Sequence, residues 1–119
     1  MRAAKVYYKN EPAGILSENE SGYEFRYNES YLQNEAAKPI SLTLPLQQLP
    51  YQSKILFPFF DGLIPEGWLL DIAVTNWKIN QRDRFGLLLT LCRDAIGCVS
   101  VVPIESISDT NPSLNENVI

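Results

Sequence analysis

A change in hydrophobic periodicity near Lys54 is the feature that most limits the folds open to this chain. Before it, apolar and polar residues alternate, most clearly in residues 23–27, where Glu24 and Arg26 separate three aromatic side chains. A period of two indicates a strand with one buried face. After Lys54 the apolar residues recur at helical spacing. The chain is therefore predicted to have an α+β fold, in which a small antiparallel β-sheet packs against two or three α-helices.

Turn-forming residues divide the first half of the chain into short segments. The expected strands are at residues 6–8, 15–16, 23–27 and 40–44, with turns at 10–14 and 18–22. Pro39 and Pro45 bracket the last of these strands, which favours a position near the edge of the sheet. Residues 28–38 are expected to form a polar connection, attached to the core by Tyr31 and Leu32.

The second half is expected to contain three helices and one further strand. The helices are predicted after Pro58, from Pro65 to about Lys78, and from about Gln81 through Leu91, and the strand at residues 97–102, ended by Pro103. The predicted core residues are Phe59, Phe60, Phe85, Leu88 and Val99. We expect residues 1–105 to form one domain and residues 106–119 to form a polar, flexible tail.

Composition excludes several classes of function. With 119 residues, 45% of them hydrophobic and 20% charged, the chain has room for one ordinary compact domain. Its formal net charge of −4 disfavours direct binding to nucleic acid, where neutralisation of phosphates dominates affinity. The absence of His removes Ser–His–Asp and Cys–His nucleophiles and most zinc sites.

Cys92 and Cys98 are too far apart for a Cys-x-x-Cys motif and have apolar neighbours. Both are predicted to be buried free thiols, with a disulfide as the less favoured alternative. The sequence has no apolar run of the length required for a signal peptide or a membrane span, which predicts a soluble, cytoplasmic protein.

No set of residues suggests an active site. Residues 84–86 read Arg-Phe-Gly, where the kinase magnesium motif has Asp-Phe-Gly, and no glycine-rich phosphate loop accompanies them. Asp61 and Glu66 are interpreted as turn and helix-capping residues. We expect no phosphotransferase activity and no bound nucleotide, metal or other cofactor.

Trp68 allows two interpretations. On a helical wheel the neighbouring apolar residues 69–77 form one arc, and Trp68 falls on the opposite side, close to Asp71. It is either an exposed anchor for a protein partner or a core residue packed under Phe59 and Phe60. Charge is also uneven, because residues 11–35 are mainly acidic and residues 78–93 mainly basic; this pattern fits either ordinary solvated surface or a dipolar surface that orients a partner.

Three motifs resemble the N-terminal subdomain of the HipA family of toxin kinases. Residues 59–67 read FFDGLIPEG, residues 83–88 read DRFGLL, and residues 93–99 read RDAIGCV, in the order in which that family carries its corresponding motifs. The sequence departs from the family at Cys92, where glycine is usual, and at Cys98, where alanine is usual. The first departure puts a left-handed helix cap at that position in doubt.

The resemblance implies a role in a toxin–antitoxin system. Fused HipA proteins are kinases restrained by the DNA-binding antitoxin HipB, whereas split systems have a small HipS antitoxin beside a shorter HipT kinase. Because the chain starts with Met1 and continues past its last expected strand, we expect the HipS-like arrangement, a non-catalytic antitoxin that binds and restrains a HipT-like Ser/Thr kinase. The alternative is a structural module that supports a repressor complex with a HipB-like protein. The predicted partner-binding residues are Gly62, Leu63, Ile64, Pro65, Glu66, Gly67, Trp68, Asp71, Arg82 and Arg84.

Overall fold

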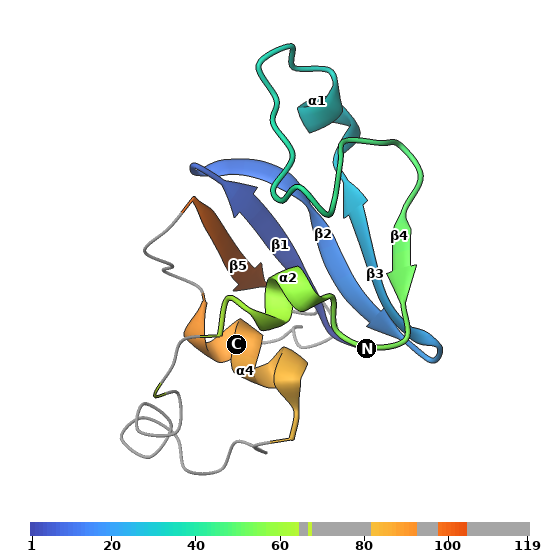
Figure 1. The fold of residues 1–119 in the computed structure, drawn as a ribbon, viewed down its shortest axis with the longest axis vertical. Coiled ribbons are helices and arrows are strands. Elements are labelled where there is room, and N and C mark those ends of the chain that lie inside the picture. Colours follow the sequence, from blue (N-terminus) through green and yellow to red (C-terminus); the bar gives the residue numbers. More distant parts are fainter. Residues whose placement is uncertain (65–66, 68–81, 93–97, 105–119) are drawn as a thin grey trace, which may run out of the picture.

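The computed structural model describes residues 1–64, 67, 82–92 and 98–104. Five antiparallel strands form one sheet in the order β4-β3-β2-β1-β5 (Figure 1). The strands are β1 (Ala3–Tyr8), β2 (Glu11–Asn19), β3 (Gly22–Tyr27), β4 (Tyr51–Ser53) and β5 (Val99–Pro103). The helices of the described residues are α1 (Glu29–Leu32), α2 (Pro58–Asp61) and α4 (Arg84–Leu91). The predicted α+β class is confirmed.

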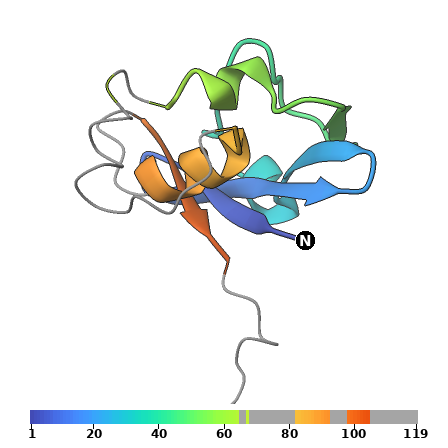
Figure 2. The same ribbon diagram turned by 90° about the horizontal axis from the view of Figure 1, so that it is seen from below.

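The sheet is buried on one face. Seen edge-on, α2 and α4 lie over the same side of the strands (Figure 2). Alternate strand residues are buried between the sheet and these helices. The fully buried side chains include Val6, Leu16, Phe25 and Val101 of the strands and Phe60, Phe85, Leu87 and Leu88 of the helices. The residues between them, such as Lys5 and Arg26, are exposed, so the period of two in the sequence matches the burial of the strands.

Of the five predicted core residues, four are buried. Phe60, Phe85 and Leu88 are fully inaccessible and Val99 is nearly so. Phe59 is only half-buried, because it lines a surface hollow while its neighbour Phe60 is fully buried; the centroids of the two rings are 5.2 Å apart.

Both expected turns are shorter than predicted. β1 and β2 are joined by Lys9 and Asn10 alone, which adopt positive φ angles of 49° and 70°. Two such residues form the tight turn whose twist matches a hairpin. Pro12, expected in the turn, lies in β2 opposite Tyr7, where the strand register shifts. In the second hairpin, Gly22 has a φ of 142° and lies so close to Ser53 O that a side chain would collide with it.

The predicted strand at residues 40–44 is wrong. This segment forms only an isolated bridge between Ser41 and Leu44, and the edge strand is β4 instead. The Ser41 hydroxyl accepts a hydrogen bond from Thr43 N at 3.2 Å and bonds the Thr43 hydroxyl at 2.9 Å. Such local side-chain bonds favour a turn over a strand. β4 has only three residues, which is too short for the sequence to show the alternation of apolar and polar residues that predicts a strand.

The other segments largely follow the prediction. Tyr31 is buried and Leu32 packs against the core, as expected for the 28–38 connection, although these residues also form the short helix α1. Helices are confirmed after Pro58 and over Arg84–Leu91, and the final strand is confirmed as β5, which includes Pro103. The helix predicted from Pro65 to Lys78 and the predicted tail lie outside the described residues. No helix within the described part is long and apolar enough to cross a membrane.

The two thiols differ in exposure. Both are free, and Cys92 is buried as predicted, but Cys98 is exposed. Cys98 lies just before β5, where its carbonyl accepts a 2.7 Å hydrogen bond from Lys9 N, so its backbone is fixed while its side chain faces solvent. Cys92 ends α4 with a φ of −112° and not in the left-handed region, in agreement with the departure from glycine at this position.

Arg2 joins the start of the sheet to the start of α4. Its guanidinium donates to both carboxylate oxygens of Asp83, at 2.5 and 2.9 Å, and to Glu18 in β2, and it lies 5.2 Å from the centroid of the Phe85 ring. Asp83 also caps α4 by accepting a 3.1 Å bond from Gly86 N. A side chain at position 86 would collide with the Asp83 carboxylate, which explains a glycine in the first turn of this helix.

Loss of Arg2 should flatten the acid dependence of stability. Hydrogen bonds from Arg2 lower the pKa of Asp83 and of Glu18 from their ordinary values of 3.8 and 4.5. At a pH above their ordinary pKa values, both carboxylates are ionised and their bonds to Arg2 stabilise the fold. This contribution is lost as the pH falls through the lowered pKa that each group has in the folded protein. Since the three side chains are partly exposed, Arg2→Gln should reduce the free energy of unfolding at pH 7 by only about 1 kcal/mol.

Urea unfolding of the wild type and Arg2→Gln at pH 7 and pH 3 measures this effect. The difference between the two proteins should be smaller at pH 3. Arg26→Gln, which removes an exposed charge from the outer face of the sheet, serves as the control. It should leave the free energy of unfolding unchanged at both pH values. An equal loss at both pH values would contradict the assignment.

Candidate partner-binding site

The predicted partner segment begins where α2 ends. Gly62 caps this helix, with its N–H donating to Pro58 O at 2.9 Å, and the following turn is held by a bond of 3.2 Å from Ile64 N to Asp61 O. Ile64 is buried and Leu63 half-buried, so these two side chains attach the corner to the core. Gly62 is exposed.

Gly67 and Arg82 are the next described residues of the predicted set. Gly67 has a φ of 79° and is exposed, and no atom of the other described residues lies within 4 Å of the place where a side chain would start. Arg82 is also exposed. Pro65, Glu66, Trp68 and Asp71 lie outside the described residues. Their part in partner binding, and the choice between an exposed and a buried Trp68, therefore stay predictions.

Arg84 and Asp61 form an ion pair that sequence reasoning did not predict. Arg84 is the first residue of α4 and Asp61 the last residue of α2, and the Arg84 Nε–Asp61 Oδ1 distance is 2.6 Å. Both side chains are about 40% exposed, so the pair contributes little to stability. The pair lies at the rim of a surface hollow of about 390 Å³, which Ile55, Leu56 and Pro58 also line.

Cys92, at the end of α4, is hydrogen-bonded to the turn that follows α2. Its thiol donates to the carbonyl oxygen of Leu63, with a sulfur–oxygen distance of 3.3 Å. Burial raises the pKa of this thiol to about 11, so it stays protonated and keeps its role as a donor at neutral pH. The corner between α2 and α4 is therefore a fixed part of the surface.

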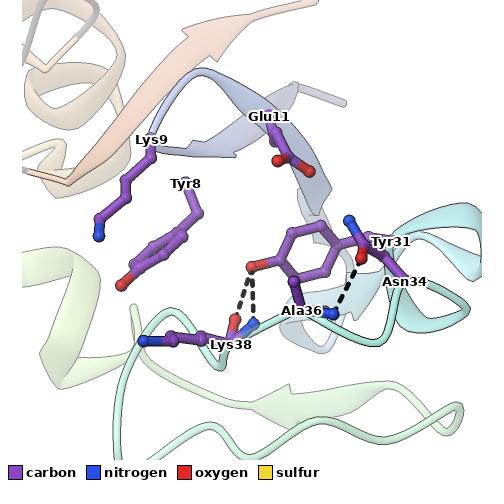
Figure 3. A pocket seen from close by; sticks show the side chains of 8 residues that line it. Tyr8, Lys9, Glu11, Tyr31, Asn34, Ala36 and Lys38 are labelled. Carbon is purple, nitrogen blue, oxygen red and sulfur yellow. Dashed lines mark hydrogen bonds between the residues drawn. The ribbon is translucent and has the colours of Figure 1, made fainter.

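Three tyrosine hydroxyls hold the loop that crosses from α1 to β4. Tyr27 accepts a 3.0 Å bond from Ile40 N and donates to Leu44 O, and Tyr51 donates to Pro45 O at 2.6 Å. Tyr31 bonds both backbone groups of Lys38 (Figure 3). Burial raises the pKa of Tyr27 to about 12, so this hydroxyl also stays protonated.

A small hollow of about 120 Å³ lies beside Tyr31 (Figure 3). Lys9 and Lys38 line it together with Glu11, whose carboxylate offsets part of their positive charge. Among the described residues, no three Cys, Asp or Glu side chains are grouped as metal ligands would be.

Sequence reasoning missed the exposed apolar side chains of residues 42–55. Leu42 and Ile55 are 94% and 67% exposed. One signal was available: between Pro39 and Phe60, Lys54 is the only charged residue. Because residues 40–44 were assigned to a strand, their leucines were expected in the core, and this apolar, nearly uncharged stretch was not recognised as exposed surface.

Comparison with known proteins places this architecture in a family. The family model of the HipA N-terminal domain matches residues 4–102. The chain belongs to the HipA N-terminal domain family. A solved structure described as the N-terminal domain of HipA toxin shares the fold, with a TM-score of 0.68 and 33% sequence identity over 88% of this chain and 94% of that one. The resemblance noted from three sequence motifs is thereby confirmed.

Relatives carry this domain in chains of different length. A Haemophilus influenzae protein, named only as uncharacterized, is 36% identical over 85% of this chain and 92% of its own length. Two Sinorhizobium fredii proteins, "Putative kinase Y4mE" and "Putative kinase Y4dM", are 27% and 33% identical. The match covers 87% and 92% of this chain but only 25% and 28% of theirs. The chain thus spans about a quarter of its kinase-named relatives.

Removing the Tyr27 hydroxyl should destabilise the protein by about 2 kcal/mol. Tyr27→Phe leaves two buried backbone groups, Ile40 N and Leu44 O, without their partner, and each unsatisfied buried group costs roughly 1–3 kcal/mol before the site relaxes. Tyr51→Phe removes a similar bond from an exposed position, where water can replace it, and should cost less than about 0.5 kcal/mol. Urea unfolding measures both, and equal losses would contradict this view of the loop.

Proposed function

We propose that this protein is a non-catalytic antitoxin that binds a HipT-like Ser/Thr kinase in the cytoplasm and restrains it. The observation that carries the proposal is the pair of sizes in which relatives occur. In the kinase-named relatives the domain is about a quarter of the chain, whereas the Haemophilus protein is matched over nearly its whole length. A domain that shares a chain with a kinase in some proteins and makes up almost all of another suits a separate regulatory subunit.

The proposed mechanism is surface complementarity without chemistry. The contact would be centred on residues 62–71, with Trp68 as the aromatic anchor and Arg82 and Arg84 as supporting charges. The ion pair with Asp61 favours Arg84 in this role, because it brings the Arg84 guanidinium to the end of α2, where the predicted contact begins. A tryptophan that is exposed has the character of an interface hot spot.

A second function is favoured by the longer relatives. The domain would act as a structural module of a kinase toxin, supporting a repressor complex with a HipB-like DNA-binding protein. Contact with DNA would then come from that partner, given the net charge of −4 on this chain. The two functions differ in one measurable respect, since a structural module binds the kinase without reducing its activity.

Mixing the purified protein with its HipT-like kinase tests the proposal. Autophosphorylation should fall as the protein is titrated in and should be largely abolished at a saturating concentration. The protein alone, incubated with ATP and magnesium, should transfer no phosphate. Binding with undiminished autophosphorylation would favour the structural module, and the absence of binding would refute both functions.

Trp68→Ala should weaken the kinase complex at least 30-fold while leaving the isolated fold intact, as expected for a hot spot worth about 2 kcal/mol. Trp77→Ala is the matched control: it removes the same ring from the apolar arc of the predicted helix and should lower the melting temperature instead. Calorimetric titration and thermal melts give the two readouts. A Trp68→Ala protein that melts like the wild type and binds equally well would rule out Trp68 as the anchor.

A further inference from the structure

Exposed apolar side chains gather in one stretch of the described chain. Six large hydrophobic residues are exposed among all the described residues. Four of them fall within residues 42–55: Leu42, Leu46, Leu49 and Ile55. Single exposed hydrophobic residues are normal on a protein surface, but a local concentration marks an interaction site.

Two hollows adjoin this stretch, each of about 390 Å³. The first lies between the Ser41–Leu44 turn and residues 57–59, and the second is the hollow lined by Ile55 and the Asp61–Arg84 pair. They meet at Pro58, which lines both. The Ser41–Leu44 turn, Ile55 and residues 57–59 are therefore linked through Pro58, and we call these residues the 41–59 surface; Leu42 belongs to it as the exposed residue of the turn and lines neither hollow.

The turn that presents Leu42 is fixed before any partner arrives. Leu44 N donates to Ser41 O at 3.1 Å, and the hydroxyls of Ser41 and Thr43 close the turn from its side chains. Tyr27 holds both of its flanks from the core. A fixed turn loses little conformational entropy on binding, so an apolar side chain at its tip is suited to insertion into a partner.

Charge identifies the class of partner. Lys54 is the only charged residue between Pro39 and Phe60, and the charges at the far rim, Asp61 and Arg84, already neutralise each other. Nucleic acids and anionic lipid surfaces are bound through groups of Lys and Arg, which this surface lacks. The complementary face is that of a protein, apolar at its centre, with an acidic side chain placed to meet Lys54.

We propose that the 41–59 surface is a second docking site for the kinase partner, distinct from residues 62–71. The inference rests on the proposed function. The kinase-named relatives support this occupant, because about three quarters of each of those chains lies beyond the shared domain and is available to cover the surface. Leu42 enters an apolar pocket of the kinase, and the two hollows receive aliphatic side chains from it.

Single aspartate substitutions in the full 119-residue protein test the inference. Leu42→Asp and Ile55→Asp place a charge in the proposed contact and should each weaken kinase binding at least tenfold in calorimetric titration. Gln48→Asp is the matched control: it adds the same charge to the same loop, lies outside the Ser41–Leu44 turn and outside both hollows, and should change the dissociation constant less than twofold. Thermal melts should be unchanged, because these side chains are exposed; if Leu42→Asp fails to fold, Leu42→Ser replaces it.

The outcomes separate this inference from the proposed function. If the wild type binds the kinase and both aspartate variants bind equally well, the 41–59 surface is not a docking site, while the proposed function stands. If the wild type does not bind the kinase, the proposed function and this occupant both fail. A wild-type dimer that Leu42→Asp dissociates, in sedimentation without kinase, would assign the surface to a second copy of the chain and overturn the inference.

Discussion

The contact between Phe60 and Phe25 holds the two halves of the molecule together. Their ring centroids are 5.5 Å apart, and both side chains are completely buried, one from α2 and one from the central part of β3. A sheet with one buried face is stable only when another layer covers that face. α2, with four residues, could not persist without this packing, and the fixed corner that follows it depends on the same contact.

Polar groups in the core then determine the shape of the surface. The connection from α1 to β4 has no regular structure to satisfy its backbone, so tyrosine hydroxyls from β3 and α1 take over part of that task. The same bonds hold Ile40 and Leu44, which flank the exposed Leu42. Core and surface are therefore not independent, and a substitution at Tyr27 would alter the exposed 41–59 surface although Tyr27 itself is buried.

The sequence was most informative where side-chain periodicity and burial coincide. The alternation at residues 23–27 predicted β3, and the apolar spacing around Phe85 and Leu88 predicted α4. Residues 40–44 misled, because alternation there comes from a turn whose hydroxyls bond its own backbone. The Asp61–Arg84 pair could not be predicted, since it depends on how two helices far apart in sequence meet. Within the segment 62–71, residues 62–67 belong to a family motif, whereas Trp68 and Asp71 were singled out by their place on a helical wheel.

The pairing of β1 with β5 has a consequence for how the protein is made. Ala4 in β1 pairs with Pro103 in β5. β1 therefore lacks one of its two neighbouring strands until nearly the whole domain has been synthesised. Until then the β1 edge is open to other chains, and closing it requires contacts of high sequence separation, which form slowly. The last step of folding therefore follows translation of β5, and any delay in that step leaves the β1 edge exposed for longer.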